Sequence, residues 1–178
     1  MVSLTVIFWL FVFLFAIIGA MRGWAKELMV SFSVILAMFI IVLMETYAPP
    51  FQPGGGLGDS VRFWIRFIII LLSVFFGYQT PNIRALAGAR FARERLQDVL
   101  LGFILGGING YLVVGTIWYY MDAAGYPIGD YFTAPDRNTD LGQAAIELLE
   151  HMPPIFLDPP LIYFAVAIAF LFVVVVFI

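Results

Sequence analysis

Residues that could carry out chemistry are few in this sequence and lie far apart. His151 is the sole histidine and cysteine is absent, which excludes a thiolate metal site, a disulfide and a cysteine nucleophile. A zinc site needs three or four clustered ligands, and a serine nucleophile needs a histidine within hydrogen-bond reach. Nothing in the pattern brings His151 near Ser31, Ser33 or Ser73, which lie in the apolar runs. We therefore predict that the protein is not an enzyme and holds no cofactor or metal.

The composition is typical of a membrane protein. The 178 residues are 63% hydrophobic and 12% charged, with a mean hydropathy of +1.01. A soluble domain carries about 25% charged residues, so a large soluble core does not explain these values. No basic patch is large enough for nucleic acid, and we expect membrane lipids as the surroundings instead.

Long apolar runs predict the fold. A bilayer core about 30 Å thick needs roughly 20 residues of helix, and an isolated strand would leave its backbone unpaired in lipid. We therefore predict an all-α polytopic bundle of transmembrane helices. Its five spans are residues 2–21, 28–44, 61–78, 99–121 and 161–178. The first run has no basic segment before it and no small-residue cleavage site, so we interpret it as a retained helix rather than a signal peptide.

The charges of the segments between the spans predict an orientation. Segments 22–27 and 79–98 contain most of the lysines and arginines, whereas segments 45–60 and 122–160 are mainly acidic. Because basic segments stay in the cytoplasm, the N-terminus is expected outside the membrane and the C-terminus inside.

Two of these segments resemble surface helices. Residues 140–151 place leucines and alanines on one face and glutamates opposite, which predicts a short helix within an acidic outer segment, residues 126–158. Residues 82–98 mix apolar residues with arginines. They form either an amphipathic helix on the inner leaflet or a solvated connector, and both interpretations stay open.

Two arginines at the start of the third run need an explanation. Arg62 and Arg66 are four residues apart, which puts them on one helix face, and charge within a membrane is usually paired or functional. Arg62 can extend its side chain to the interface, and the same holds for Arg66 as the simplest interpretation. Alternatively, Arg66 lies deeper and pairs with Glu45, Asp59, a lipid phosphate or another subunit.

Glycines recur at helical spacing in the fourth run. Gly102, Gly106 and Gly110 are each four residues apart, and Gly19 and Gly23 repeat the spacing at the end of the first run. Small residues let helix backbones approach in lipid, so we predict close helix packing within the chain or between subunits. The polar residue before the last glycine of the fourth run, Asn109, is expected to hydrogen-bond a neighbouring helix.

Two motifs resemble the colicin V production protein family, the CvpA-like membrane proteins. GAMRGWAKEL at 19–28 is similar to the family's Gly-x-x-Arg-Gly-x-x-(Arg/Lys)-Glu turn between the first two helices. Asp98, followed by glycines at every fourth position, matches the start of its fourth helix. The resemblance covers about residues 1–125 and implies a four-helix core. It also implies a bacterial inner-membrane protein without a recognised active site.

The family pattern suggests a role for the charges of the first turn. If it applies here, Arg22 and Glu27 pair with each other or meet Asp98 and Arg95 across the cytoplasmic face. Both are therefore candidate interaction residues, together with Arg62, Arg66, Asp98 and Asn109.

Three functions follow from these observations. The first is a non-enzymatic membrane protein that acts through protein partners in colicin V (toxin) export or production, or in envelope maintenance, as the resemblance implies. The second is an accessory structural subunit of a larger membrane complex, such as an energy-converting one. The third is a homo-oligomeric channel with the glycine-rich fourth helix at the pore or at the subunit interface.

Overall fold

A computed structural model of the chain describes residues 4–52, 54–79, 92–129 and 131–177. All regular secondary structure in these ranges is helical, which confirms the predicted all-α polytopic bundle. The elements are α1 (Leu4–Arg22), α2 (Trp24–Tyr47), the short 3-10 helix η1 (Pro49–Phe51), α3 (Asp59–Tyr78), α4 (Ala92–Ala123), α5 (Asp140–Leu149), α6 (Pro153–Phe156) and α7 (Leu161–Phe177).

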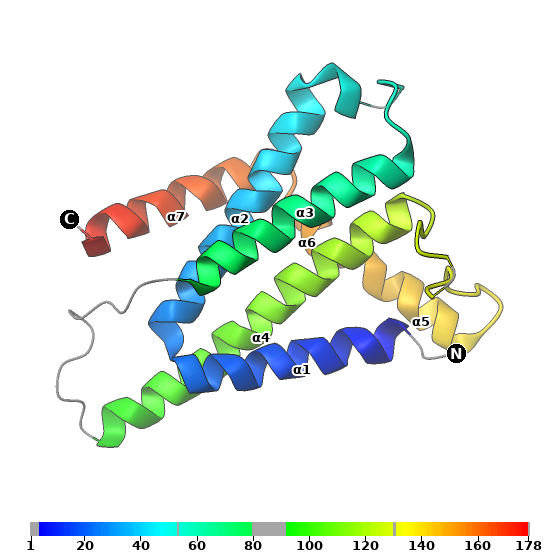
Figure 1. Ribbon diagram of the computed structural model, residues 1–178. Helices are drawn as coiled ribbons and strands as arrows, with labels where there is room; N and C mark the ends of the chain where they lie inside the picture. The colour runs from blue at the N-terminus through cyan, green and yellow to red at the C-terminus, as the bar shows by residue number, and fades with distance from the viewer. Residues whose placement is uncertain (1–3, 53, 80–91, 130, 178) are drawn as a thin grey trace.

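The long helices are arranged around α2 and α4. Helix α1 lies along α4, and α2 packs against both α3 and α4 (Figure 1). Helix α7 packs mainly against α2. The bundle has two ends. The start of α1, the α2–α3 connection and α5 lie at one, which we name the α5 end. The α1–α2 junction, the start of α4 and the end of α7 lie at the other, the Gly23 end (Figure 1).

Within the described ranges, four helices are long and apolar enough to cross a membrane, namely α1, α2, α3 and α4. Helix α7 has 17 residues. It passes the same test only when it is joined to the α5–α6 segment, across a bend of 59°. Large apolar side chains point outward from all five helices, among them Trp9, Leu36, Phe76, Ile104 and Phe170. Such a surface suits contact with lipid.

The core is built mainly from one face of α2. Val30, Val34, Met38 and Ile41 recur every third or fourth residue and are fully buried. Apolar side chains from the other spans close over them, including Phe8, Phe63, Ile70 and Leu112. The central position of α2 means that a polar residue on this face must find its partners inside the protein.

The expected turn at 22–27 is much shorter than predicted. Helix α1 ends at Arg22 and α2 begins at Trp24, so Gly23 alone separates them. Gly23 has a φ of 89°, a conformation that glycine adopts without strain. The charged residues Lys26 and Glu27 belong to the first turns of α2, which is longer than the expected span at both ends.

Residues 92–98 are helical, as one of the two open interpretations had it, but they are not a separate element. We expected a surface helix or a connector before a span at 99–121, but these residues continue α4, a helix of 32 residues. Such a helix is about 48 Å long, so it exceeds a bilayer core of about 30 Å and extends beyond it. The other residues of that expected segment, up to 91, lie outside the described residues.

The predicted outer helix is present as α5. The Thr139 hydroxyl accepts a hydrogen bond from the backbone N–H of Gly142 and caps its first turn, as is typical of threonine. Ala145 and Leu149 face the protein. Helix α5 ends at Leu149, and a short helix, α6, begins at Pro153. Proline fits the first position of a helix.

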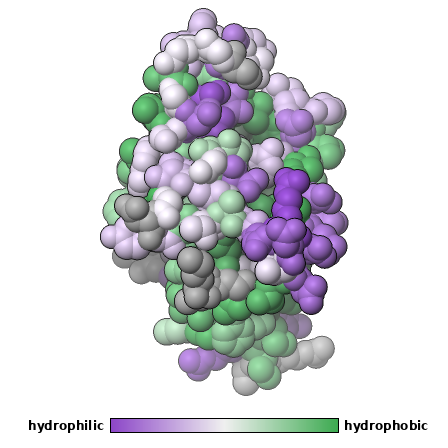
Figure 2. All heavy atoms as spheres, turned by 90° about the vertical axis from the view of Figure 1, so that its right-hand side faces the viewer, coloured by the Kyte–Doolittle hydropathy of each residue, from purple (hydrophilic) through white to green (hydrophobic). Residues whose placement is uncertain are grey.

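The surface at the α5 end is largely hydrophilic. Hydrophilic residues gather on this face, while hydrophobic residues dominate toward the bottom of the view (Figure 2). Beneath it, Tyr126 follows α4 and is buried. Its hydroxyl accepts a hydrogen bond from Trp118 Nε1 at 3.2 Å. Burial raises the pKa of Tyr126, because the phenolate would be desolvated.

Candidate functional site

Two polar clusters occupy opposite ends of the α2–α4 contact. On α2, Glu27 and Ser31 lie near one end of the buried face and Glu45 near the other. Between them the contact is almost entirely apolar. The buried hydroxyl of Thr116 on α4 finds only the sulfur of Met38, at 3.6 Å. We name the two groups the Glu27 cluster and the Glu45 cluster.

The Glu27 cluster consists of Arg22, Glu27, Ser31 and Asn109. Arg22 Nη1 lies 2.6 Å from Glu27 Oε1. Asn109 Nδ2 donates to the other carboxylate oxygen of Glu27 at 2.8 Å and to the Glu27 backbone carbonyl at 2.9 Å. Ser31 Oγ donates to Asn109 Oδ1 at 2.6 Å. Because a carboxylate only accepts hydrogen bonds, these contacts fix the orientation of the Asn109 amide.

Arg22 extends this cluster to a fourth helix, α3. Its Nη2 donates to the backbone carbonyl of Tyr78 at 3.1 Å, and its guanidinium lies over the Tyr78 ring, 4.2 Å from the centroid. A cation over an aromatic face is favourable, and more so away from water. One side chain from the end of α1 therefore ties together α2 and the end of α3.

The burial of Glu27 would be costly without these partners. Glu27 and Asn109 are both 0% exposed, and an unpaired carboxylate at such a site would be strongly destabilised. Here both carboxylate oxygens are engaged. Glu27 also lies in the first turn of α2, where the helix dipole favours negative charge. The cluster is thus closed and internally satisfied.

Asp98 lies against the start of α2. Its Oδ1 accepts a hydrogen bond from the backbone N–H of Trp24 at 3.3 Å, so a residue of α4 caps the start of α2. A Cβ atom on Gly23 would lie 2.8 Å from each Asp98 carboxylate oxygen, so this position also needs glycine for space. Arg22 and Glu27 pair with each other, and Arg95 is exposed.

The spaced glycines bring α1 and α4 into backbone contact. A Cβ atom on Gly19 would clash with the Gly102 carbonyl oxygen and lie 2.7 Å from Gly106 Cα. A Cβ atom on Gly110 would lie 2.9 Å from Val12 Cα. Of the two arrangements that the spacing left open, the structure has the contact within the chain.

The Glu45 cluster consists of Glu45, Arg66 and Tyr120. Arg66 Nη2 lies 2.6 Å from Glu45 Oε1, and the guanidinium lies over the Tyr120 ring, 4.6 Å from the centroid. Among the partners considered for Arg66, the structure therefore has Glu45. Arg62 pairs with Asp59 one turn away, near the start of α3.

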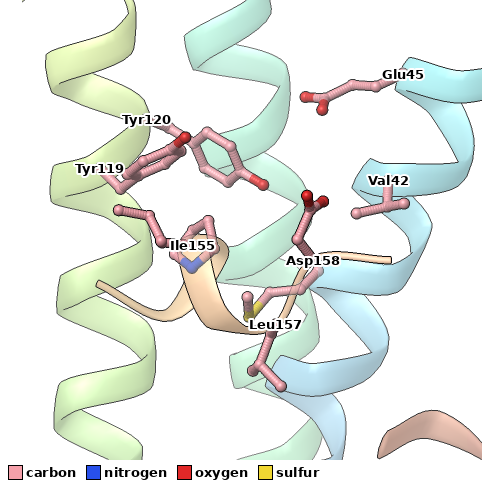
Figure 3. Close-up of a pocket in the computed structure, with 9 residues that line it drawn as sticks. Val42, Glu45, Tyr119, Tyr120, Ile155, Leu157 and Asp158 are labelled. Atoms are coloured by element: carbon pink, nitrogen blue, oxygen red, sulfur yellow. The ribbon is translucent and has the colours of Figure 1, made fainter. Parts of the chain in front are cut away.

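A cavity of about 270 Å³ adjoins the Glu45 cluster. Figure 3 shows two acidic side chains there, Glu45 from α2 and Asp158 from the segment between α6 and α7, with Tyr119 and Tyr120 of α4. The other lining residues are Met38, Val42, Pro154, Ile155 and Leu157. The cavity lies at the α5 end.

His151 does not contribute to either cluster. Its Nδ1 lies 2.9 Å from the Glu147 carbonyl oxygen, and its own carbonyl accepts a hydrogen bond from the Tyr111 hydroxyl. In the part of the chain that the structure describes, no three histidine, aspartate or glutamate residues are grouped as metal ligands.

A comparison with protein families places the chain. The model of the family described as "Colicin V production protein" matches residues 4–134, which is more than half of the sequence. The chain belongs to the colicin V production protein family. Neither the curated proteins nor the solved structures gave a match. The family and the apolar helices together make it a multi-pass membrane protein of colicin V production type.

Sequence reasoning missed several residues in or beside the two clusters of this colicin V production family protein. Ser31 and Tyr78 were not singled out around Arg22 and Glu27, and Tyr120 and Asp158 were not connected with Glu45. One signal was available, since Ser31 follows Glu27 by four residues and thus lies on the same helix face. The contributions of Tyr78 and Tyr120 come from other helices, and no spacing along the chain indicates them.

Proposed function

We propose that this protein acts in the bacterial inner membrane as a non-enzymatic component that works through protein partners. Its process would be colicin V (toxin) export or production, or envelope maintenance, in keeping with its family. The proposal includes an N-terminus outside the membrane and a cytoplasmic C-terminus, since the basic residues Arg22, Lys26 and Arg95 lie toward the Gly23 end.

The observation that carries this proposal is the closure of the Glu27 cluster. A catalytic or transport site must admit its substrate, but the polar groups of Glu27 and Asn109 are fully buried and engaged with one another. Intramembrane charge is often functional; here it holds α1, α2, α3 and α4 in one arrangement. The Glu27 cluster therefore offers no site to a substrate, which supports action through partners at the outer surface.

An export assay tests the process. In a strain that secretes colicin V, deletion of the gene is expected to reduce toxin in the medium, and the wild-type chain is expected to restore it. Cross-linking in intact membranes followed by mass spectrometry then identifies the partners. Unchanged toxin release and an unchanged envelope phenotype in the deletion strain would contradict the proposal.

The absence of cysteine allows a clean test of orientation. Tyr131→Cys places a thiol on a residue that is 83% exposed at the α5 end, and Arg95→Cys places one near the start of α4. A membrane-impermeant maleimide should label position 131 in intact spheroplasts and position 95 only after lysis. The reverse pattern would invert the topology.

A second candidate is an accessory subunit of a larger membrane complex. Helix α7 supports it, because this helix packs mainly against α2 and leaves Ile168, Phe170 and Val175 exposed. Purification from the native membrane in mild detergent would recover such a subunit at a fixed ratio to the other chains. The channel alternative has less support, because Gly102, Gly106 and Gly110 already face α1; conductance in planar bilayers would test it.

A further inference from the structure

The cavity at the α5 end has an unbalanced charge. Arg66 neutralises Glu45, at 2.6 Å. Asp158 also lines the cavity, and its carboxylate has no ion-pair partner within the described ranges. The walls therefore carry one net negative charge, which favours a cation of single charge.

Tyr120 supplies an independent reason to expect a ligand. This residue is only 6% exposed, and its hydroxyl points into the space between Glu45 and Asp158 (Figure 3). Within the described part of the chain the hydroxyl makes no hydrogen bond, since the contacts of Tyr120 are with the Tyr119 ring and the Arg66 guanidinium. A hydroxyl that no protein group engages can both donate and accept a hydrogen bond, so it is available to a ligand in the cavity.

The number of oxygen atoms in the cavity wall indicates which kind of cation fits. A metal ion of the hard type takes six or more oxygen ligands, and no group of three acidic or histidine side chains is found among the described residues. An organic ammonium group needs fewer oxygen partners. It has three N–H donors, and the cavity presents three acceptors, the carboxylates of Glu45 and Asp158 and the Tyr120 hydroxyl.

We propose that this cavity binds a primary ammonium group. A volume of about 270 Å³ holds a small amine or the ethanolamine headgroup of a phospholipid, and both carry the same ammonium. A trimethylammonium group, as in choline, fits less well because it has no N–H to donate. The inference goes beyond the proposed function and does not depend on it.

The test uses the full chain purified in detergent and titrated with ethanolamine, with choline as the matched ligand. Ethanolamine should bind and choline should not. Asp158→Asn should weaken ethanolamine binding about ten-fold or more, because a charged hydrogen bond is removed. Tyr120→Phe should weaken ethanolamine binding by a smaller factor. This substitution removes only the hydroxyl and keeps the ring beneath Arg66. Glu147→Gln and Tyr131→Phe make the same kinds of change on exposed residues away from the cavity and should have no effect.

The source of the ammonium is determined in nanodiscs. Binding of free ethanolamine identifies a small amine as a sufficient ligand. Co-purification of phosphatidylethanolamine over phosphatidylcholine, lost in the Asp158→Asn protein, identifies the headgroup. The proposal is overturned if neither ethanolamine nor phosphatidylethanolamine binds, if choline binds equally well, or if Asp158→Asn binds like the wild type.

Discussion

The two ends of α2 use the same chemistry and reach different outcomes. At each end a glutamate of α2 pairs with an arginine at 2.6 Å, and that arginine lies over a tyrosine ring, at 4.2 Å for Arg22 and 4.6 Å for Arg66. The Glu27 side chain is completely buried, whereas the side chain of Glu45 is 32% exposed. The Glu27 cluster is closed, and the Glu45 cluster borders a cavity.

Two physical differences explain this contrast. Asn109 fills the space beside Glu27 and satisfies its second carboxylate oxygen, while the space beside Glu45 is the cavity lined by Asp158. Helix polarity adds to the contrast, since Glu27 lies in the first turn of α2 and Glu45 near its last, where a negative charge is disfavoured. A closed pair stabilises the fold, and an open pair remains available to a ligand.

The same substitution at both ends gives the sharpest comparison, and Glu27→Gln should have the largest effect. Both Arg22 and Asn109 donate to the Glu27 carboxylate, but a glutamine has one acceptor oxygen and so leaves one buried donor unmatched. We expect the free energy of unfolding to fall by about 3 kcal/mol. Unfolding by SDS in mixed micelles, followed by circular dichroism, measures this change.

A stable Glu27→Gln protein would contradict the view that the cluster holds the spans together. Arg22→Gln in the same assay, alone and combined with Glu27→Gln, completes a double-mutant cycle. Strong coupling between the two positions is expected, and additive effects would mean that the pair is not the cause.

Gly106→Ala should have the next largest effect, because it pushes apart the helices beside the Glu27 cluster. A Cβ atom there would lie 2.9 Å from Gly19 Cα and 3.1 Å from Ala16 Cα, and these backbone atoms cannot move aside independently. We expect a loss of about 2 kcal/mol in unfolding free energy. Thermal unfolding of the purified protein is a convenient readout.

Gly107→Ala is the matched control for that change. The same Cβ atom would meet only the Ala16 side chain, at 3.7 Å, an ordinary contact. This variant should therefore unfold like the wild type. Equal losses for both variants would show that the effect of Gly106→Ala does not depend on its close contact with α1.

Glu45→Gln should cost less than its counterpart at the other end. Glu45 is partly exposed, and Arg66 can still donate to the neutral glutamine oxygen or reach toward water. A loss of about 1 kcal/mol or less is expected, as for partly solvated pairs. If Glu45→Gln is as damaging as Glu27→Gln in the same SDS titration, the distinction between a closed and an open cluster fails.

Arg62→Gln should have the smallest effect. Its partner Asp59 is largely exposed at the start of α3, and exposed pairs contribute little. We expect a change below about 0.5 kcal/mol in the same assay. A larger loss would mean that Arg62 has a role in the membrane beyond this pair.

The all-α bundle, the approximate spans and the glycine spacing could all be predicted from the amino-acid sequence. These features depend on the hydropathy and side-chain size of single segments, so they can be read from one run at a time. The motif at 19–28 and the glycines after Asp98 also indicated the family, which the match over residues 4–134 confirms.

The tertiary structure alone decided which residues meet. The spacing of Gly102 and Gly106 did not say that they face Gly19, and Arg66 had several candidate partners before α2 and α3 were placed side by side. The start of α2 also differs from the predicted one. Gly23 and the hydrogen bond to Asp98 let the helix begin before its apolar run does. A contact depends on how two helices are rotated against each other, and that relation is a property of the packed bundle.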